Sequence, residues 1–322
     1  MKAVSFFAGV GGIDLGFESA GFDCIWANEI DSYAAQTYKA NFSNELVVND
    51  IRNINPKDIP EADILLAGFP CQAFSVAGYR KGFNDERGNL FFDLMRIIED
   101  KLPPVLFLEN VKNLLSHDSG KTFRIILEAL EINGYYVKYK VLNASDYGNI
   151  PQNRERIYIV AFKDERSFRN FEFPHPQELT STLNNFIHYN SKVDEKYYYT
   201  QDKCKFYNEL KENVKRKDTI YQWRRVYVRE NKSDLCPTLT ANMGTGGHNV
   251  PLIISKYGIR KLTPRECFNL QGYPEGYVLP EYLSNTRLYK QAGNSVVVPV
   301  VELIAEQIMK AITQDIQIER AV

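Results

Sequence analysis

A continuous apolar run at residues 64–67 is the feature that most constrains the fold of this chain. Such a run is typical of a strand that is buried on both faces of a parallel sheet. Other apolar runs, at residues 3–7, 24–27, 47–48 and 105–108, are separated by helical patterns. We therefore expect an α/β fold with an open, mostly parallel sheet, in which ligands bind beyond the carboxyl ends of the strands.

Gly9, Glu29 and Asp50 follow three consecutive strands of this expected sheet. Glu29 lies 20 positions after Gly9, near the offset at which an acidic side chain accepts hydrogen bonds from ribose hydroxyls. These residues predict a pocket for an adenosine-bearing ligand. The glycine spacing differs from the dinucleotide fingerprint, because Asp14 stands where its third glycine would fall. A purely structural tight turn is an equal alternative for the glycines alone.

Cys71 and Glu109 follow two further strands in equivalent positions. The polar residues 76–89 contain three glycines and predict a mobile loop beyond Cys71. A thiol beneath a movable loop suggests a nucleophile whose reaction is shielded from water. For a cysteine considered alone, a small buried hydrophobe is the alternative interpretation.

Arg154 and Arg156 alternate along an extended segment before the apolar run at residues 157–161. Alternation puts both side chains on one face, so that both can point at one anion or carbonyl group. Two solvated arginines at a sheet edge are the alternative.

The composition excludes several classes of protein. Five cysteines without a C-x-x-C pair argue against a disulfide framework or a zinc finger and favour a reducing, cytoplasmic compartment. No apolar run approaches the roughly 18–20 residues of a membrane span, and the first residues lack the pattern of a signal peptide. The net charge of −1 decides nothing about a polyanionic partner, since binding depends on where the charge lies. We expect a complete, soluble protein with no membrane partner.

The character of the chain changes near residue 174, where long polar stretches and tyrosines replace the regular pattern. Residues 203–232 contain ten Lys or Arg and four Asp or Glu, a local charge of +6, interleaved with aromatic residues. This combination suits nucleic acid, although a solvated charged face is the favoured explanation for the segment taken alone. We expect a first domain of residues 1–175 plus 288–322, completed by a C-terminal helix at 296–312, and a second domain of residues 176–287.

From Phe7 to about Ile308, the chain resembles the DNA (cytosine-5)-methyltransferases of bacterial restriction–modification systems. The motifs that carry the resemblance occur in the family's order and are residues 7–12, Asn28-Glu29, Pro70-Cys71-Gln72, Glu109-Asn110-Val111, Gln152-x-Arg154-x-Arg156, Arg265-Glu266-Cys267 before Gln271-Gly272-Tyr273-Pro274, and Gly293-Asn294-Ser295. One departure is Ser5-Phe6, where the family more often has Asp-Leu. The resemblance implies a Rossmann-like S-adenosylmethionine-dependent methyltransferase sheet with a smaller, irregular target-recognition domain.

The resemblance also implies a reaction, in which a methyl group passes from S-adenosylmethionine to carbon-5 of a cytosine flipped out of a short specific DNA site. Cys71 would add to carbon-6, because carbon-5 is a poor nucleophile until an enamine forms. Glu109 would bond to ring N3 and the exocyclic amine. Arg156, helped by Arg154, would hold the O2 atom of the base.

The cofactor-binding residues implied in the same way surround the glycines and the strand ends, with no metal required: Phe7, Gly9, Gly11, Gly12, Glu29, Ile30, Asp50, Ile51, Pro70, Asn294 and Ser295. The expected DNA-binding residues lie beside Cys71 and in the second domain: Gln72, Ser75, Gln222, Arg224, Arg225, Arg229, Thr238 and Leu239. The expected partners are double-stranded DNA and, functionally, a restriction endonuclease of the same specificity, with the enzyme itself a monomer. The expected recognition site is short and palindromic and contains G·C pairs.

Three other functions compete with this one. A tRNA carbon-5 methyltransferase is similar in its catalytic motifs, and methyl transfer to duplex DNA and to tRNA separates the two. A DNA-binding regulator with a vestigial catalytic domain predicts no turnover. A nicotinamide-dependent dehydrogenase fits the glycine turn but leaves Pro70-Cys71-Gln72 unexplained.

Overall fold

The computed structural model of the chain describes residues 1–70, 90–224, 226–245 and 250–319. Cys71, Gln72, Ser75, Arg225 and the expected loop at 76–89 lie outside the described residues. The chain divides into two compact units. The first unit comprises Met1–Leu142, Glu155–Pro174 and Val301–Val322, and the second comprises Asn143–Arg154 and His175–Val300. Residues 143–154 and 288–300 thus group with the second unit, whereas the sequence-based boundaries assign them to the first domain.

A seven-stranded sheet forms the centre of the first unit, in the order β3-β2-β1-β4-β5-β8-β6. Its strands are β1 (Lys2–Phe6), β2 (Asp23–Glu29), β3 (Glu45–Val48), β4 (Ile64–Ala67), β5 (Val105–Val111), β6 (Tyr136–Asn143) and β8 (Glu155–Phe162). The first five strands pair in parallel, and β8 pairs antiparallel to β5. The carboxyl ends of β1, β2, β4 and β5 therefore meet at one edge of the sheet, which we call the carboxyl edge.

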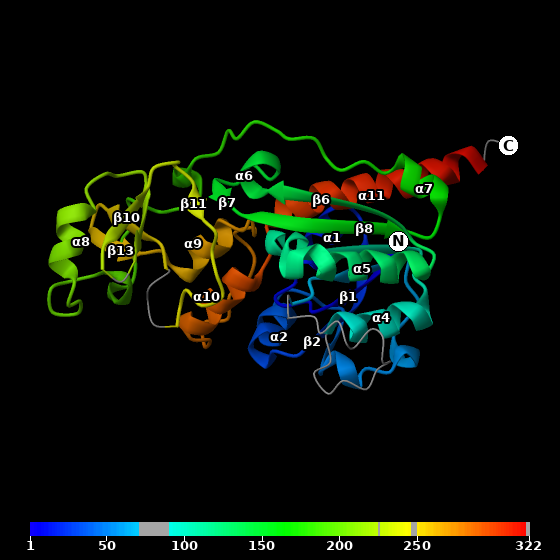
Figure 1. Cartoon of the computed structure of the whole chain (residues 1–322). Helices are drawn as coiled ribbons and strands as arrows, with labels where there is room; N and C mark the ends of the chain where they lie inside the picture. Colours follow the sequence, from blue (N-terminus) through cyan, green and yellow to red (C-terminus); the bar gives the residue numbers. More distant parts are fainter. Residues whose placement is uncertain (71–89, 225, 246–249, 320–322) are drawn as a thin grey trace. The chain divides into compact units, whose positions relative to one another are not determined.

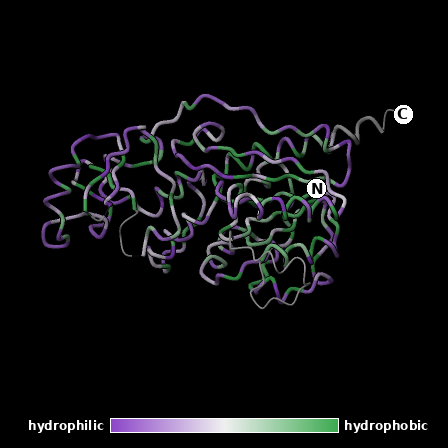
Figure 2. The backbone as a smooth tube through the Cα atoms, viewed as in Figure 1, coloured by the Kyte–Doolittle hydropathy of each residue, from purple (hydrophilic) through white to green (hydrophobic). Residues whose placement is uncertain are grey.

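The helices of the first unit cover both faces of this sheet (Figure 1). They are α1 (Gly12–Ser19), α2 (Ser32–Lys39), α4 (Leu90–Lys101), α5 (Lys121–Ile132), α7 (Glu165–Asn170) and α11 (Val298–Glu319), which begins in the second unit. Alternate residues of β4, β5 and β8 pack against α4 and α5 in one core cluster. The intervening residues face α1, where the rings of Phe17 and Phe107 lie 4.9 Å apart. Figure 2 shows hydrophobic residues concentrated along these strands.

The sequence predicts Ser32 as the N-cap of a helix that ends at about residue 41, but helix α2 begins one residue earlier. Asp31, rather than Ser32, is the N-cap, and its carboxylate accepts hydrogen bonds from the backbone N–H groups of Tyr33 and Ala34 at 3.0 and 3.3 Å. Both residue types are good N-caps, so local sequence alone does not separate them. The C-terminal helix is also longer than predicted, since α11 continues to Glu319.

The second unit is built around a four-stranded antiparallel sheet in the order β10-β9-β12-β13. Its strands are β9 (Ile220–Trp223), β10 (Val228–Asn231), β12 (Leu252–Ser255) and β13 (Gly258–Lys261), with a separate pair of β7 (Gln152–Asn153) and β11 (Cys236–Pro237). Its helices are α6 (Ala144–Tyr147), α8 (Tyr207–Asn213), α9 (Pro264–Asn269) and α10 (Asn285–Asn294). The unit predicted to be irregular therefore has an ordered sheet of its own.

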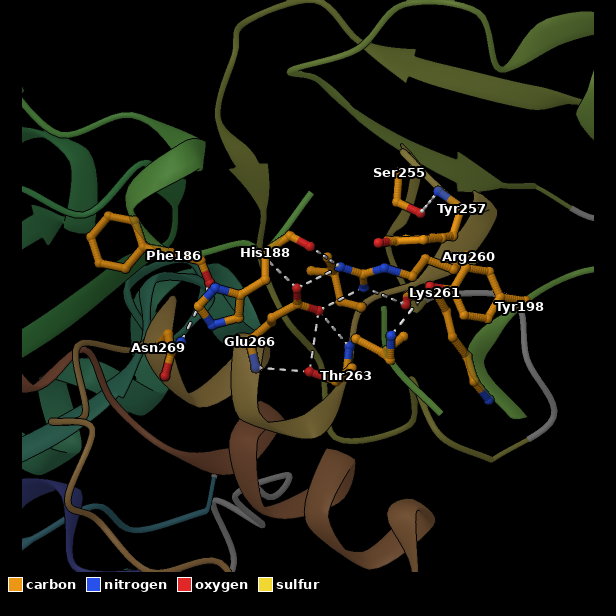
Figure 3. Close-up of polar contacts among 12 residues, drawn as sticks. Phe186, His188, Tyr198, Ser255, Tyr257, Arg260, Lys261, Thr263, Glu266 and Asn269 are labelled. Atoms are coloured by element: carbon orange, nitrogen blue, oxygen red, sulfur yellow. Dashed lines mark hydrogen bonds and ion pairs between the residues drawn. The ribbon is translucent and has the colours of Figure 1, made fainter. Parts of the chain in front are cut away.

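A buried polar network joins β13 and α9 in the second unit (Figure 3). Glu266 lies in the first turn of α9 and forms a capping box with Thr263. Its carboxylate also accepts from Arg260 and from the backbone N–H of His188. This network anchors the helix that carries the predicted Arg265-Glu266-Cys267 motif. None of the described helices in either unit is long and apolar enough to cross a membrane.

Candidate active site

The glycine turn, residues 7–12, connects β1 to α1 at the carboxyl edge. Phe7, Gly9 and Gly11 have φ angles of 54°, 58° and 78°, a region that L-residues adopt at a cost. A Cβ atom on Gly11 would lie 2.2 Å from Cε2 of Phe42. Gly11 therefore has both a left-handed backbone conformation and no space for a side chain, which explains why glycine is needed at this position.

Glu29, at the end of β2, points its carboxylate at this turn. One oxygen accepts a hydrogen bond from the N–H of Gly9 at 2.7 Å, and the other accepts from the N–H of Asp31 at 2.7 Å. The side chain is buried, and burial raises the pKa of Glu29 although the backbone hydrogen bonds lower it. A tight turn with a fixed carboxylate beside it is the arrangement that binds the ribose of adenosine-bearing ligands in related folds, so this role of Glu29 stays a prediction.

The other predicted cofactor residues have diverse environments. Asp50 caps a short 3₁₀ helix, η1 (Ile51–Asn53), and forms an ion pair with Arg52, whose hydrogen bond lowers the pKa of Asp50. Gly12 opens α1, Ile51 is buried, and Ile30 is 61% exposed. Pro70 is exposed at the last described position before Cys71. Asn294 and Ser295 belong to the second unit, where the Ser295 hydroxyl lies 2.5 Å from that of Tyr273.

Glu109 and Arg156 face each other on neighbouring strands at the same edge. Nε of Arg156 lies 3.1 Å from Oε1 of Glu109, and both side chains are largely buried. Glu109 stands within β5 rather than just after it, because β5 and β8 remain paired as far as Val111 and Arg156. A Cβ on Gly68 would lie 3.6 Å from Oε2 of Glu109, so the chain after β4 approaches this carboxylate closely. The pair can hydrogen-bond to both the donor and the acceptor edge of a planar heterocycle.

Asn110 is a site residue whose individual role the sequence did not reveal. Its side-chain amide donates to the carbonyl oxygen of Phe69 at 2.9 Å, and its own oxygen accepts from the N–H of Val111 at 2.8 Å. Phe69 is two residues before Cys71. Asn110 therefore ties the segment that leads to Cys71 to the strand that carries Glu109.

Arg154 and Arg156 do not share one acceptor, contrary to the expectation from their spacing. Arg154 is buried in the second unit, and its guanidinium donates to the backbone carbonyl oxygens of Leu239 at 2.7 Å, of Gly293 at 3.0 Å and of Ser295. Alternation gives the direction in which a side chain leaves the backbone, but its partners come from segments 85 to 141 residues away. Arg154 therefore holds together three segments of the second unit.

Four of the five cysteines lie among the described residues, and all four are buried. Burial raises the thiol pKa of Cys24, Cys204, Cys236 and Cys267. Since the thiolate is the nucleophilic form, none of these four suits nucleophilic chemistry at neutral pH.

Three of the predicted DNA-binding residues, Gln222, Arg224 and Arg229, lie on the β9–β10 hairpin of the second unit. Gln222 and Arg229 are directly opposed across the two strands, and Nη2 of Arg224 donates to Oε1 of Gln222 at 3.0 Å. Arg224 and Arg229 are exposed, whereas Gln222 is 7% exposed. The hairpin thus presents two cations on one face.

Other predicted contacts in this unit are less accessible. Leu239 is 1% exposed, so its side chain is not available to DNA in this structure, and the Thr238 hydroxyl donates to the carbonyl oxygen of Asn153 at 2.6 Å. The aromatic residues interleaved with the basic run were expected to be available to nucleic acid, but not all of them are. Tyr221 and Trp223 pack in the core of the unit, while Tyr227 is 52% exposed.

The sheet and the residues at its carboxyl edge define a doubly wound α/β protein of the kind that binds ligands at this edge. The sequence model of the C-5 cytosine-specific DNA methylases matches residues 1–310. The chain therefore belongs to this family, and its activity is that of a DNA (cytosine-5)-methyltransferase.

Individual relatives agree with this assignment. The chain is 64% identical over 313 residues to the type II methyltransferase M.Bsp6I of Bacillus sp. (strain RFL6), covering 97% of this chain and 99% of that protein. It is 40% identical to the type II methyltransferase M.HhaI of Haemophilus parahaemolyticus, covering 96% and 94%. The crystal structure of S. pombe Dnmt2 methyltransferase has the same fold, with a TM-score of 0.75 at 19% identity over 97% of this chain and 99% of that one.

Proposed function

We propose that Cys71, Glu109 and Arg156 carry out the methylation of carbon-5 of cytosine through a covalent enzyme–DNA adduct. The observation that carries this proposal is the contact of 3.1 Å between Glu109 and Arg156, beside the segment that leads to Cys71. The Cys71 thiolate adds to carbon-6 of the ring, which makes carbon-5 an enamine carbon able to accept a methyl group. A proton is then lost from carbon-5, and the bond between Cys71 and carbon-6 breaks by elimination, which releases the thiolate. Glu109 holds ring N3 and the exocyclic amine, and Arg156 holds O2, so that negative charge on the ring is stabilised.

S-adenosylmethionine, when bound, supplies a methyl group already activated on a sulfonium. We assign its adenosine to the glycine turn and to Glu29, because Gly9 has no side chain to keep a ligand from the backbone and the carboxylate is fixed beside it. Asp50 follows strand β3, which is the neighbour of β2 in the sheet, and we assign it to the adenine ring of the cofactor. Asn294 and Ser295 remain predicted contacts.

The second unit is proposed to read the DNA, with Arg224 and Arg229 of the β9–β10 hairpin as the leading candidates. Arginine recognises guanine through two hydrogen bonds worth roughly 1–3 kcal/mol of discrimination. The target cytosine must leave the duplex to meet a buried acid and guanidinium, since these groups cannot reach it within the base stack. We further propose that the enzyme acts as a monomer and protects host DNA from a restriction endonuclease of the same specificity.

Covalent trapping tests the proposal. The protein is incubated with S-adenosylmethionine and duplex DNA in which 5-fluorocytosine replaces cytosine, and adducts are located by mass spectrometry. An adduct on Cys71 is expected, because fluorine cannot leave carbon-5 as a cation. Cys71→Ser should give no adduct while still binding DNA, and the buried-cysteine control Cys24→Ala should give the wild-type adduct. Trapping of substituted tRNA in place of DNA, or an adduct at another residue, would contradict the proposal.

A further inference from the structure

The carboxylate of Asp14 is buried beneath the glycine turn and has no part in the proposed chemistry. Asp14 lies in the first turn of α1 and is 0% exposed. It accepts a hydrogen bond from the Ser5 hydroxyl of β1 at 2.9 Å and another from the Tyr38 hydroxyl of α2 at 2.7 Å. A buried carboxylate is costly unless it is hydrogen-bonded, so these contacts fix three elements of the unit to one another.

Tyr38 extends this arrangement to the back of the glycine turn. Its ring is 0% exposed and packs with Ala8 of the turn and with Ala27 of β2. The ring also stacks on Phe42, with the centroids 4.4 Å apart. Phe42 in turn occupies the space that a side chain at Gly11 would fill. Asp14 is therefore connected to both Ala8 and Gly11 through one hydroxyl and two stacked rings.

We propose that Asp14 and Tyr38 are positioning residues for S-adenosylmethionine, which hold the glycine turn in the conformation that receives the cofactor. Three residues of the turn have positive φ angles, and such a backbone persists where its surroundings hold it in place. Without its hydroxyl, the Tyr38 ring loses its hydrogen bonds to Asp14 and to Asn44 and is held by packing alone. The packing behind Ala8 and Gly11 then loosens. This inference rests on the proposed use of the turn as the cofactor site.

The Tyr38→Phe variant tests the proposal, with Tyr135→Phe as a matched control. Tyr135 is also buried in the first unit, and its hydroxyl donates to the carbonyl oxygen of Pro103 at 2.8 Å, before β5 begins and hence away from the carboxyl edge. The dissociation constant of S-adenosylmethionine is measured by calorimetry, and stability is measured by urea unfolding. Loss of the hydrogen bonds of the hydroxyl to Asp14 and Asn44 should weaken cofactor binding by about 10-fold in Tyr38→Phe. Tyr135→Phe should lose comparable stability and bind the cofactor as the wild type does.

Kinetics and the acid itself give independent tests. Tyr38→Phe should raise KM for S-adenosylmethionine while leaving kcat at saturating cofactor near the wild-type value. Asp14→Asn should retain cofactor affinity, because its amide oxygen can accept from Tyr38 and its amide nitrogen can donate to Ser5. Asp14→Ala should lose affinity, and if that variant does not fold, the two tyrosine variants decide.

The outcomes separate this inference from the proposed function. Tyr38→Phe with wild-type cofactor affinity and the stability loss of Tyr135→Phe would show a structural role alone and overturn the inference. Failure of the wild-type protein to bind S-adenosylmethionine would instead overturn the cofactor assignment itself.

Discussion

Arg260 and Glu266 form an ion pair inside the second unit, with neither side chain exposed to solvent. The two terminal nitrogens of Arg260 donate to the two carboxylate oxygens of Glu266 at 2.8 and 2.7 Å. The N–H groups of Thr263 and His188 donate to the same carboxylate at 2.8 and 2.9 Å (Figure 3). Burial opposes ionisation of Glu266, but these hydrogen bonds and the charge of Arg260 outweigh it and lower its pKa.

Breaking this pair should strongly destabilise the protein. Arg260→Met leaves the Glu266 carboxylate buried without its counter-charge, and the expected loss in the free energy of unfolding is about 3–5 kcal/mol by urea denaturation. The exposed pair between Arg169 and Glu165, at 2.5 Å, provides the control. Arg169→Ala should cost less than about 1 kcal/mol. Equal losses in the two variants would show that burial does not determine the strength of the Arg260–Glu266 pair.

Arg154→Lys and Arg156→Lys should fail in different ways. Lysine at 154 cannot serve three carbonyl oxygens with the geometry of a guanidinium, so we expect a lower melting temperature and near-normal kcat per folded molecule. Lysine at 156 keeps the charge but loses the planar fork beside Glu109, so kcat should fall by about 10²–10³-fold at little cost in stability. Thermal unfolding and single-turnover methylation measure the two effects. The reverse pattern would assign the catalytic contact to Arg154.

Asn110→Ala should slow the attack of Cys71 on the base. The substitution removes the 2.9 Å hydrogen bond to the Phe69 carbonyl and releases the segment before Cys71, the proposed nucleophile. Because misplacement of a reacting group by about 1 Å can cost 10²-fold, the rate of 5-fluorocytosine trapping should fall by about 10–100-fold with DNA affinity unchanged. Asn133→Ala is the control, since its side chain also donates to a backbone carbonyl at 2.9 Å but caps the end of α5. Trapping at the wild-type rate in Asn110→Ala would refute this role.

The sequence predicted the elements whose hydrophobic pattern is strong. The run at residues 64–67 is β4, buried at every position, and the run at residues 105–108 forms the first part of β5. Periodicity identifies such segments because burial of apolar surface determines them locally. Once these strands were predicted, the position of the carboxyl edge could be predicted too, because parallel strands place their carboxyl ends together.

Features that depend on distant partners could not be predicted in the same way. The partners of Arg154 lie in segments remote in sequence, and the core position of Trp223 depends on its stacking with Phe206, whose ring centroid is 4.3 Å away. In the sequence, Asp14 stands out because it replaces the third glycine of a dinucleotide-binding motif. Its burial could have been suspected from its position between the apolar residues Ile13 and Leu15. Its partners Ser5 and Tyr38 come from two other elements, so the pairing itself required the structure.

Ionisation of Asp14 should make the stability of the protein depend on pH. Burial raises the pKa of Asp14 from 3.8 to about 6, although the hydrogen bonds from Tyr38 and Ser5 oppose the increase. The folded protein therefore binds a proton more tightly than the unfolded chain does. The stabilising contribution of this proton is complete below the unfolded pKa and is lost as pH rises through about 6.

The Asp14→Asn variant isolates this contribution, because asparagine does not titrate and all other groups are shared with the wild type. Between about pH 7 and pH 5, the free energy of unfolding of the wild type should increase relative to that of Asp14→Asn by on the order of 1 kcal/mol. Urea unfolding at several pH values measures the difference. Burial also raises the pKa of Glu18 in the same helix, and this part of the increase is present in both proteins and cancels. The charge of Asp14 raises the pKa of Glu18 further, so that smaller part is lost in Asp14→Asn and belongs to the contribution of Asp14. If the difference in free energy of unfolding between the two proteins does not change with pH, Asp14 has the same pKa in the folded protein and in the unfolded chain. The hydrogen bonds from Ser5 and Tyr38 would then fully compensate the effect of burial on this pKa.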